Sequence, residues 1–283
     1  MNFKNLFLNP HNTLESGGKA PIRKVTCREC KRETSFIKVR MNNYICPMCN
    51  SYFPIRARRR IIMIFDKRSF VEIDREMTSK NILDFPGYDK KLEGAIKKSR
   101  ELEGVICGYG TINKQKCAVF SMDPYFMMGS MGAIVGEKIT RLFEYATENS
   151  MPVVGITVSG GARMQEGMIS LMQMSKVSAA VKKHSDKGNL YIALLTNPTT
   201  GGVNASFAML SDIAIAEPNA RIGFAGPRVI KESLGVDLPK DFQMSERVLE
   251  CGFIDKIVNR ENLKEELSTI LKLHDRGVID GRL

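Results

Sequence analysis

The chain has few of the residues from which conventional catalytic sets are built. Its 283 residues include three histidines, His11, His184 and His274. Each lies in a polar stretch, so we expect all three on the solvated surface and not in a catalytic triad. Gly-x-Ser-x-Gly, Gly-x-x-x-x-Gly-Lys-Ser/Thr and Gly-x-Gly-x-x-Gly are also missing. Their absence argues against a serine nucleophile elbow, a P-loop and a dinucleotide-binding turn.

Long apolar runs and a disulfide framework are missing as well. No apolar run reaches the about eighteen residues of a membrane helix, and Met1–Pro10 is too short and too polar for a signal peptide. Seven cysteines is an odd number, and four of them form two close pairs, which argues against a secreted, disulfide-bonded protein. We therefore expect a soluble cytosolic protein without membrane insertion, with the plastid stroma left open. Cys107, Cys117 and Cys251 are expected to be small core residues.

The positive charge is concentrated near one end of the chain. Of the net charge of +11, residues 23–60 carry +9, because they include eleven Lys or Arg and two Glu. Arg56, Arg58, Arg59 and Arg60 form a cluster within this segment, and aromatic residues are interleaved with it. Binding of nucleic acid by this segment is one hypothesis. The same charge could instead face an anionic ligand or an acidic partner.

Two C-x-x-C pairs in the basic segment have the spacing of a zinc ribbon. Cys27 and Cys30 form the first pair, and after fifteen residues Cys46 and Cys49 form the second. Such pairs present four thiolates at tetrahedral positions around one Zn²⁺. A site closed by four thiolates has no open position for catalysis, so the zinc is expected to be structural. Four incidental buried cysteines, or a redox pair, explain the spacing less well.

The rest of the chain alternates strands with helices, which predicts an α/β domain. The expected strands are 116–122, 153–159, 190–196, 212–216 and 221–225, and the expected helices are 132–149, one that follows the first glycine pair, 245–251 and 263–273. Met164, Met168 and Met172 recur at helical spacing, and we expect them to pack in the core and not to form a cofactor site. The chain is therefore divided into a flexible leader (1–22), a zinc ribbon (23–60) and an α/β domain (61–283).

Two of the expected strands run into a glycine pair and then into a helix. Gly160, Gly161 and Ala162 follow the first strand, and Gly201 and Gly202 follow the second. Glycine lets a ligand approach the backbone closely, and unpaired N–H groups at a helix start point outward as donors. Two such donor sets at one point would form an oxyanion hole. The alternative is that each pair only permits close packing between a strand and a helix.

Several ordered motifs resemble one protein family, the β subunit of the multisubunit acetyl-CoA carboxylase carboxyltransferase. In chain order they are Gly129-Ser130-Met131-Gly132, Glu137-Lys138, 159–167, 170–174, 198–203 and 223–230. The amino-terminal ribbon matches as well, so the resemblance extends from about Cys27 to the last helix. It implies a crotonase-like fold, a superhelix of ββα units. The implied reaction transfers a carboxyl group from carboxybiotin to acetyl-CoA and gives malonyl-CoA for fatty acid synthesis.

The resemblance also implies where the ligands bind. Gly160, Gly161 and Ala162 would be one set of donors, and Gly201 and Gly202 the other; which set serves the thioester and which the biotin stays open. Contacts with a cofactor are expected at Gly129, Ser130, Met131, Gly132, Arg163, Arg228 and Lys231. The three basic residues are candidates for the CoA phosphates by their charge, and a solvated surface position explains each of them equally well.

The family resemblance implies that other chains complete the enzyme. There is no Ala-Met-Lys-Met biotinylation site, so biotin would arrive on a carrier protein loaded by a separate biotin carboxylase. The chain has length for one crotonase-like domain, so an α subunit would provide the second in an α2β2 heterotetramer. Carboxybiotin would also supply the base, so none is needed from the protein. The alternative of a crotonase-fold hydratase or isomerase would use a carboxylate, and Glu166 would be that residue.

Overall fold

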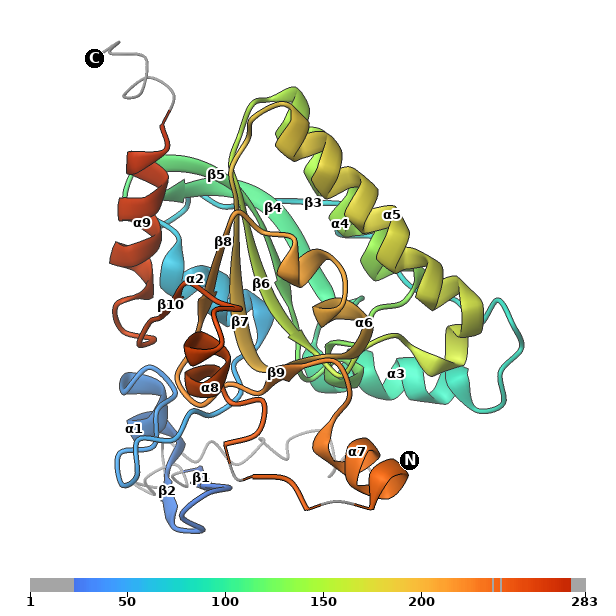
Figure 1. Cartoon of the computed structure of the whole chain (residues 1–283), viewed down its shortest axis with the longest axis vertical. Coiled ribbons are helices and arrows are strands. Elements are labelled where there is room, and N and C mark those ends of the chain that lie inside the picture. Colours follow the sequence, from blue (N-terminus) through green and yellow to red (C-terminus); the bar gives the residue numbers. More distant parts are fainter. Residues whose placement is uncertain (1–22, 236, 240, 276–283) are drawn as a thin grey trace, which may run out of the picture. The chain divides into compact units, whose positions relative to one another are not determined.

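The computed structural model describes residues 23–235, 237–239 and 241–275. The chain divides into two compact units between Phe53 and Pro54 (Figure 1). This division lies before the boundary expected at residue 60, because helix α2 (Ala57–Ile64) packs in the core of the second unit. The expected leader, 1–22, lies outside the described residues.

The first unit is a small ribbon around the two cysteine pairs. Strands β1 (Lys24–Thr26) and β2 (Glu33–Ser35) pair antiparallel, and α1 (Phe36–Met41) follows them. Cys27 and Cys30 lie in the turn between the strands, and the second cysteine pair lies in a similar turn after α1. The ribbon expected from the cysteine spacing is thus present in the backbone.

The second unit is built on an eight-stranded sheet in the order β10-β8-β7-β6-β5-β4-β3, with β9 paired to the end of β7. The strands are β3 (Val71–Ile73), β4 (Val105–Ile112), β5 (Gln115–Met122), β6 (Val153–Ser159), β7 (Tyr191–Thr200), β8 (Ile213–Ala216), β9 (Ile222–Gly223) and β10 (Lys256–Ile257). Strands β3, β4 and β5 pair antiparallel, and the pairs from β5 to β10 are parallel. Every residue of β6 is buried, as expected for a parallel strand covered on both faces.

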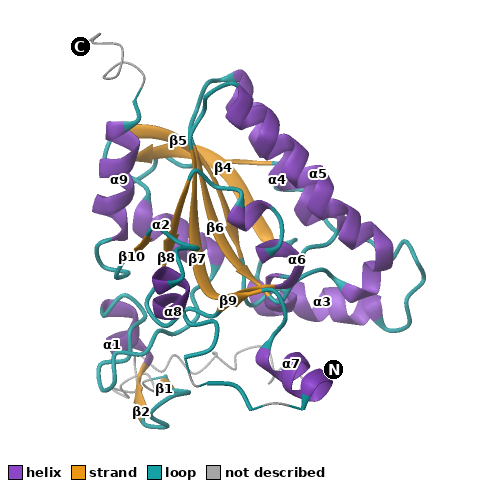
Figure 2. Ribbon diagram, in the orientation of Figure 1, coloured by secondary structure: helices purple, strands orange, loops and turns teal. Residues whose placement is uncertain are grey.

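Helices cover both faces of this sheet (Figure 2). On one face, α4 (Ala133–Glu148) and α5 (Gly167–Asp186) pack together and bury a layer that includes Ile139 and Phe143. On the other face, α2 and α9 (Leu263–Leu273) bury Ile61 and Leu267. The remaining helices are α3 (Tyr88–Ser99), α6 (Gly201–Asn204), α7 (Pro227–Leu234), α8 (Ser245–Glu250) and the 3-10 turns η2 (Met127–Gly129), η3 (Met164–Glu166) and η4 (Phe207–Met209). Among the described residues, no helix is long and apolar enough to cross a membrane.

The expected core packing of the methionine stripe is wrong. Met164, Met168 and Met172 are 82%, 69% and 62% exposed, so they lie outside the buried face of α5. The core side of α5 is formed by smaller residues such as Val177 and Ala180. The helical spacing of the methionines therefore predicted the helix correctly, but the prediction of which side of the helix is buried was wrong.

Two other positions also differ from expectation. His184 is fully buried on α5, where its Nδ1 lies 2.9 Å from Thr147 Oγ1, and burial lowers its pKa. Cys251 is exposed at the end of α8. Cys107 and Cys117 are buried, as expected, in the antiparallel part of the sheet.

Candidate functional site

The two glycine turns touch each other. The backbone φ angles of Gly161 and Gly201 are +113° and +62°, values that favour glycine. A Cβ added to Gly201 would lie 2.8 Å from the Cα of Gly161, and one added to Gly161 would lie 3.3 Å from the Cα of Gly201. Neither residue can carry a side chain without moving the other turn. The fold thus brings together two pairs that are forty residues apart in the chain.

Parallel pairing of β6 with β7 produces this contact. Ser159 and Thr199 are partners at the ends of the two strands, where the register shifts after Thr157. The Thr199 hydroxyl lies 3.0 Å from that of Thr157, and both are buried. Thr200 Oγ1 donates to the carbonyl of Ser159 over 3.0 Å. Buried hydroxyl groups therefore fix the strand ends from which the glycine turns start.

Two backbone N–H groups are left without an acceptor where the turns meet. Ala162 lies opposite Met131 in a parallel bridge that uses the N–H groups of Met131 and Arg163. Gly202 lies in the first turn of α6, where N–H groups have no partner within the helix. Within the described part of the chain, the N–H groups of Ala162 and Gly202 donate to no acceptor. A Cβ on Gly202 would lie 3.8 Å from the Cβ of Ala162, so these two donors come from neighbouring residues.

The N–H groups of the other three glycines are occupied. Gly160 donates to the carbonyl of Met128 over 3.1 Å, and Gly201 donates to the carbonyl of Phe224 over 2.8 Å. Gly161 donates to Ser159 Oγ over 3.0 Å. Of the five residues expected to form the donor sets, Ala162 and Gly202 therefore carry the N–H groups that are available to a ligand.

Neither the backbone conformation nor the packing around residue 160 requires a glycine there. It is exposed, and its φ lies outside the left-handed region. Among the described atoms, a Cβ added there would have one neighbour within 4 Å, the Cβ of Met128 at 3.9 Å. The open space beside Gly160 suits a ligand that approaches the backbone closely.

The segment before α4 supports the first turn. Met127, Met128 and Gly129 have φ angles of +46°, +58° and +64°, a run of left-handed residues that is costly for methionine. The Met131 N–H donates to the carbonyl of Gly161 over 2.9 Å. Of the expected cofactor contacts in this segment, Gly129, Met131 and Gly132 are buried, and Ser130 is half-buried.

Arg163 does not fit its expected role at the CoA phosphates. Its side chain is fully buried and pairs with Glu103 (Nη2 to Oε1, 2.7 Å) and Glu166 (Nη1 to Oε1, 3.2 Å). Burial alone would lower the pKa of Arg163, but the charge of Glu103, the hydrogen bond to it and the contact with Tyr88 together outweigh burial and raise this pKa. An arginine already enclosed by carboxylates cannot reach a phosphate in solvent.

Glu166 is likewise engaged inside the protein. It is buried, and it accepts hydrogen bonds from the Tyr88 hydroxyl (2.6 Å) and the Ala133 N–H (2.5 Å). Together with Arg163, these donors occupy both carboxylate oxygens. This environment does not suit the proton-transfer role that a hydratase or isomerase would require of Glu166.

The other two basic candidates lie on α7. Lys231 is exposed and pairs with Asp237 over 2.5 Å. The side chain of Arg228 lies outside the described part of the structure. The Gly201 N–H of the second turn donates to the carbonyl of Phe224, and α7 begins three residues later at Pro227. Helix α7 therefore starts close to the second glycine turn.

The arginine cluster of residues 56–60 belongs to the second unit, and two of its four arginines are neutralised there. Arg58 pairs with Glu72 and Glu101 over 2.8 and 2.6 Å, and buried Arg60 pairs with Glu217 over 2.6 Å. The charges of Arg58 and Arg60 are therefore balanced by carboxylates of their own unit.

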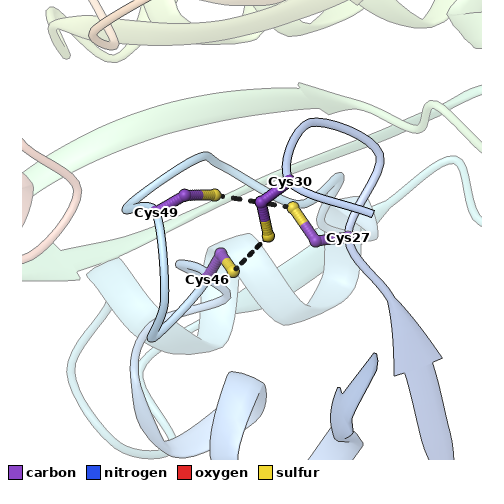
Figure 3. Close-up of side chains that lie close together, drawn as sticks. All are labelled: Cys27, Cys30, Cys46 and Cys49. Atoms are coloured by element: carbon purple, nitrogen blue, oxygen red, sulfur yellow. Dashed lines mark hydrogen bonds between the residues drawn. The ribbon is translucent and has the colours of Figure 1, made fainter. Parts of the chain in front are cut away.

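The four cysteines of the ribbon form a compact set of sulfur ligands (Figure 3). Their Sγ atoms all lie within 4.8 Å of one another. Cys27 and Cys49 are 3.7 Å apart, and Cys30 and Cys46 are 3.9 Å apart. Four thiolates bound to zinc at about 2.3 Å lie roughly 3.8 Å from one another in a tetrahedron. The arrangement therefore fits a single four-coordinate metal ion.

Comparison with known proteins defines the class of this fold and site. Residues 55–273 match the carboxyl transferase domain family, to which the chain belongs. A transcarboxylase 12S structure with methylmalonyl-coenzyme A bound has a TM-score of 0.67 and 28% identity, over 77% of this chain and 41% of that chain. A Pseudomonas malonate decarboxylase heterodimer has a TM-score of 0.61 at 21% identity and shows the fold alone. These neighbours confirm the expected crotonase-like α/β fold.

Curated relatives narrow the class to one kind of subunit. The acetyl-coenzyme A carboxylase carboxyl transferase subunit beta of Ruminiclostridium cellulolyticum is 53% identical over 97% of both chains. That of Clostridioides difficile is 50% identical over 88% of both. A Clostridium tetani relative named as subunits beta/alpha is 52% identical over 88% of this chain, which covers 43% of that protein. The expected resemblance to the β subunits is confirmed.

Proposed function

We propose that this chain is one half of an acetyl-CoA carboxyltransferase, which transfers a carboxyl group from carboxybiotin to acetyl-CoA and forms malonyl-CoA for fatty acid synthesis. The observation that carries the proposal is the pair of free N–H groups at Ala162 and Gly202. Two backbone donors at one point stabilise the negative charge that develops on a thioester oxygen when the acetyl group becomes an enolate. The names of the curated relatives supply the substrate.

Within the described residues, Glu166 and His184 are not available to act as a base at this site. Glu166 is bonded on both oxygens, and His184 is buried on α5 against Thr147. When bound, carboxybiotin supplies the carboxyl group and the base for the α proton. The part left to this chain is to bind the thioester beside Gly160, to orient its oxygen toward Ala162 and Gly202, and to stabilise the enolate.

We propose that an α subunit covers the exposed methionines of η3 and α5 in an α2β2 heterotetramer. Leu171 on α5 is exposed beside these methionines, and Ile82, Leu83 and Phe85 of the segment before α3 are exposed as well. The Leu83 side chain reaches within 3.3 Å of the Cβ position of Gly167 at the start of α5. An apolar surface of this kind is typical of a protein interface. The fused beta/alpha relative supports the same partner.

The proposal includes two more partners and a cellular location. Biotin arrives on a carrier protein, and a biotin carboxylase loads it. The location is the cytosol, where the thiols of the ribbon stay reduced. We also propose that Lys231, Arg228 and the half-buried Ser130 contact the CoA moiety, because Lys231 and Ser130 reach solvent close in the chain to the two turns.

We propose that the metal of the ribbon is a structural zinc ion. The sulfur separations match a tetrahedral site, and four cysteine ligands leave no position for a substrate. A second candidate function for the ribbon is binding of nucleic acid. The ribbon retains seven exposed basic residues, which are Arg23, Lys24, Arg28, Lys31, Arg32, Lys38 and Arg40. A gel shift at low salt tests this candidate, and no shift would remove it.

The test of the main proposal uses Gly160→Ala in the enzyme assembled with its α subunit. The assay is decarboxylation of malonyl-CoA with free biotin, which is the reverse reaction. Because a methyl group at residue 160 fits the fold but enters the ligand space, we expect unchanged stability and a loss of activity of about tenfold or more. Gly94→Ala, on the exposed face of α3 with an equally open environment, is the matched control and should keep full activity. An inactive wild-type assembly, or an active Gly160→Ala enzyme, would contradict the proposal.

A further inference from the structure

A closed polar network lies beneath the first glycine turn, and Arg163 is its centre. Arg163 directly follows Ala162, and its side chain has no exposed surface. The guanidinium carbon lies 5.3 Å from the centre of the Phe126 ring. Arg163 is thus a buried charge one residue away from a free donor of the proposed site.

Arg163 holds the first glycine turn through both its backbone and its side chain. Through its backbone, the Arg163 N–H donates to the Met131 carbonyl over 2.9 Å, and the Met131 N–H donates to Gly161 over the same distance. Through its side chain, Arg163 donates to the Ser130 carbonyl over 2.9 Å and to the Ser130 hydroxyl over 3.2 Å. Ala162 is held between these contacts, so their geometry sets the direction of its N–H.

The far side of the network ties Arg163 to distant parts of the chain. Nη1 donates to Ser79 Oγ over 2.8 Å and to the Tyr88 hydroxyl over 3.2 Å. Ser79 and Gly104 both donate to Glu103, and Tyr88 donates to Glu166. Within the described chain, every side-chain nitrogen of Arg163 has at least one acceptor. A fully satisfied buried network of this kind holds one conformation.

We propose that Arg163 is a positioning residue for carboxyl transfer, which keeps the Ala162 N–H aimed at the thioester oxygen through Ser130 and Met131. Arg163 touches no ligand itself. The inference rests on the proposed function in one respect, the role of Ala162 as a donor. Because a donor that is misplaced by a fraction of a bond length stabilises the transition state less, disturbing the network should lower kcat more than it raises KM.

A purely structural role for Arg163 is the alternative, and the chain contains a matched control for it. Arg60 and Arg260 both pair with Glu217 in a second buried network, with nitrogen–oxygen distances of 2.6 and 2.8 Å. This network joins α2, the residue after β8 and the segment before α9, and its bonds to Glu217 involve neither glycine turn. Disturbing it should cost stability without affecting the donors.

The first experiment compares two tyrosines in the assembled enzyme. Tyr88→Phe removes a hydroxyl group that bonds with both Arg163 and Glu166 and keeps the buried ring. Tyr191→Phe removes an equally buried hydroxyl group that has no hydrogen-bond partner in the described part of the chain. We expect Tyr88→Phe to lower kcat by about tenfold with KM for the CoA substrate within about twofold. Tyr191→Phe should leave both constants unchanged.

Arg163→Lys and Arg60→Lys form the second pair, because both remove a bidentate contact and keep the charge. Arg163→Lys should lower kcat further than Tyr88→Phe, and Arg60→Lys should lower the unfolding midpoint with kcat within about twofold. Equal loss of kcat in both lysine variants, or no loss in Tyr88→Phe, would overturn the proposal.

Hydrogen exchange of the peptide 159–167 gives a readout that does not depend on activity. In Tyr88→Phe we expect faster exchange in this peptide than in wild type, and no change in Tyr191→Phe. Unchanged exchange in Tyr88→Phe would overturn the positioning role. If exchange changes as expected while the wild-type assembly has no carboxyltransferase activity, the network holds the turn as inferred and the proposed function is the part that fails.

Discussion

Thr200 Oγ1 donates a hydrogen bond of 3.0 Å to the carbonyl oxygen of Ser159. These two residues stand immediately before the two glycine pairs, so a single bond joins the starting points of both turns. Thr200 is 9% exposed and Ser159 is fully buried, which protects the bond from competition with water. The relative position of the two donor turns is therefore set at the ends of β6 and β7.

Replacement of this hydroxyl group should loosen the turns. In Thr200→Val the Ser159 carbonyl loses its buried donor, which should lower the free energy of unfolding by about 1 to 3 kcal/mol. Activity of the assembled enzyme should fall as well, because Gly201 and Gly202 follow directly. Urea unfolding and malonyl-CoA decarboxylation are the measurements. Thr200→Ser keeps the hydroxyl and should retain most of both properties; equal behaviour of the two variants would refute the role of the bond.

The glycines in contact should respond differently from the glycine beside open space. Gly201→Ala places a Cβ 2.8 Å from the Cα of Gly161 and requires a residue with a side chain at φ +62°. We expect it to lower the free energy of unfolding by about 1 to 3 kcal/mol and to abolish activity. Gly160→Ala should keep the wild-type stability in the same urea titration. A stable Gly201→Ala protein would mean that the two turns are not in contact in solution.

Removal of the metal should unfold the ribbon and spare the second unit. We expect one zinc ion per chain by elemental analysis, and none after Cys27→Ser, because binding of a structural zinc supplies much of the folding energy of such a small unit. A chelator should expose residues 23–53 to protease while residues 54–275 stay resistant. Cys117→Ser, at a cysteine of the sheet, is the control and should keep the metal. Full zinc content in Cys27→Ser would exclude the four-cysteine site.

Glu217 should make the second unit sensitive to acid. Burial alone would raise the pKa of Glu217, but Arg60 and Arg260 outweigh it and lower this pKa from an ordinary 4.5 to about 2. The carboxylate therefore stabilises the fold fully above about pH 4.5, and this contribution is lost as the pH falls toward about 2. In urea unfolding between pH 6 and pH 3, the free energy of unfolding of the wild type should decrease as the pH is lowered. The decrease per pH unit should be smaller in Glu217→Gln. The variant should also be less stable at neutral pH by about 3 to 5 kcal/mol, because two buried arginines lose the negative charge of Glu217. An identical slope in both proteins would contradict the assignment.

Charge on the methionine surface should prevent assembly without unfolding the chain. Met168 is 69% exposed on α5, so Met168→Glu should leave the thermal midpoint within about 2 °C of wild type, as surface substitutions do. Size-exclusion chromatography with the α subunit should then show loss of the complex. Leu273→Glu, at a residue that is 66% exposed at the end of α9, is the control and should assemble normally. Assembly of Met168→Glu at wild-type affinity would place the interface elsewhere.

Much of the sheet and both glycine turns could be predicted from the sequence. Buried parallel strands have continuous apolar runs, and β6 was predicted with its exact bounds. The amphipathic pattern of α9 was equally clear at 263–273. Strand β7 extends past the predicted end at residue 196 to Thr200, because polar threonines at its end pair with β6 and β9 instead of ending the strand.

The network around Arg163 could not be predicted because its members come from four distant segments. An arginine beside a glycine turn indicates an anion site when its partners are unknown, and only the fold brings Glu103 and Tyr88 to it. The spacing of Tyr88, Leu92, Ala95 and Ser99 on α3 was an available sign of a buried helical face. The methionine surface was misassigned for a related reason, since apolar residues at helical spacing do not distinguish a core from an interface.

The contact between the backbone atoms of Gly161 and Gly201 sets how far apart the two donor N–H groups lie. A distance that is set by an ion pair changes with pH and salt concentration. A distance that is set by van der Waals contact between two backbone segments does not. Within the described chain, each turn fills the volume that a side chain on the other would need. A side chain on either glycine would therefore displace the other turn, and both positions must stay glycine for the two donors to keep their spacing.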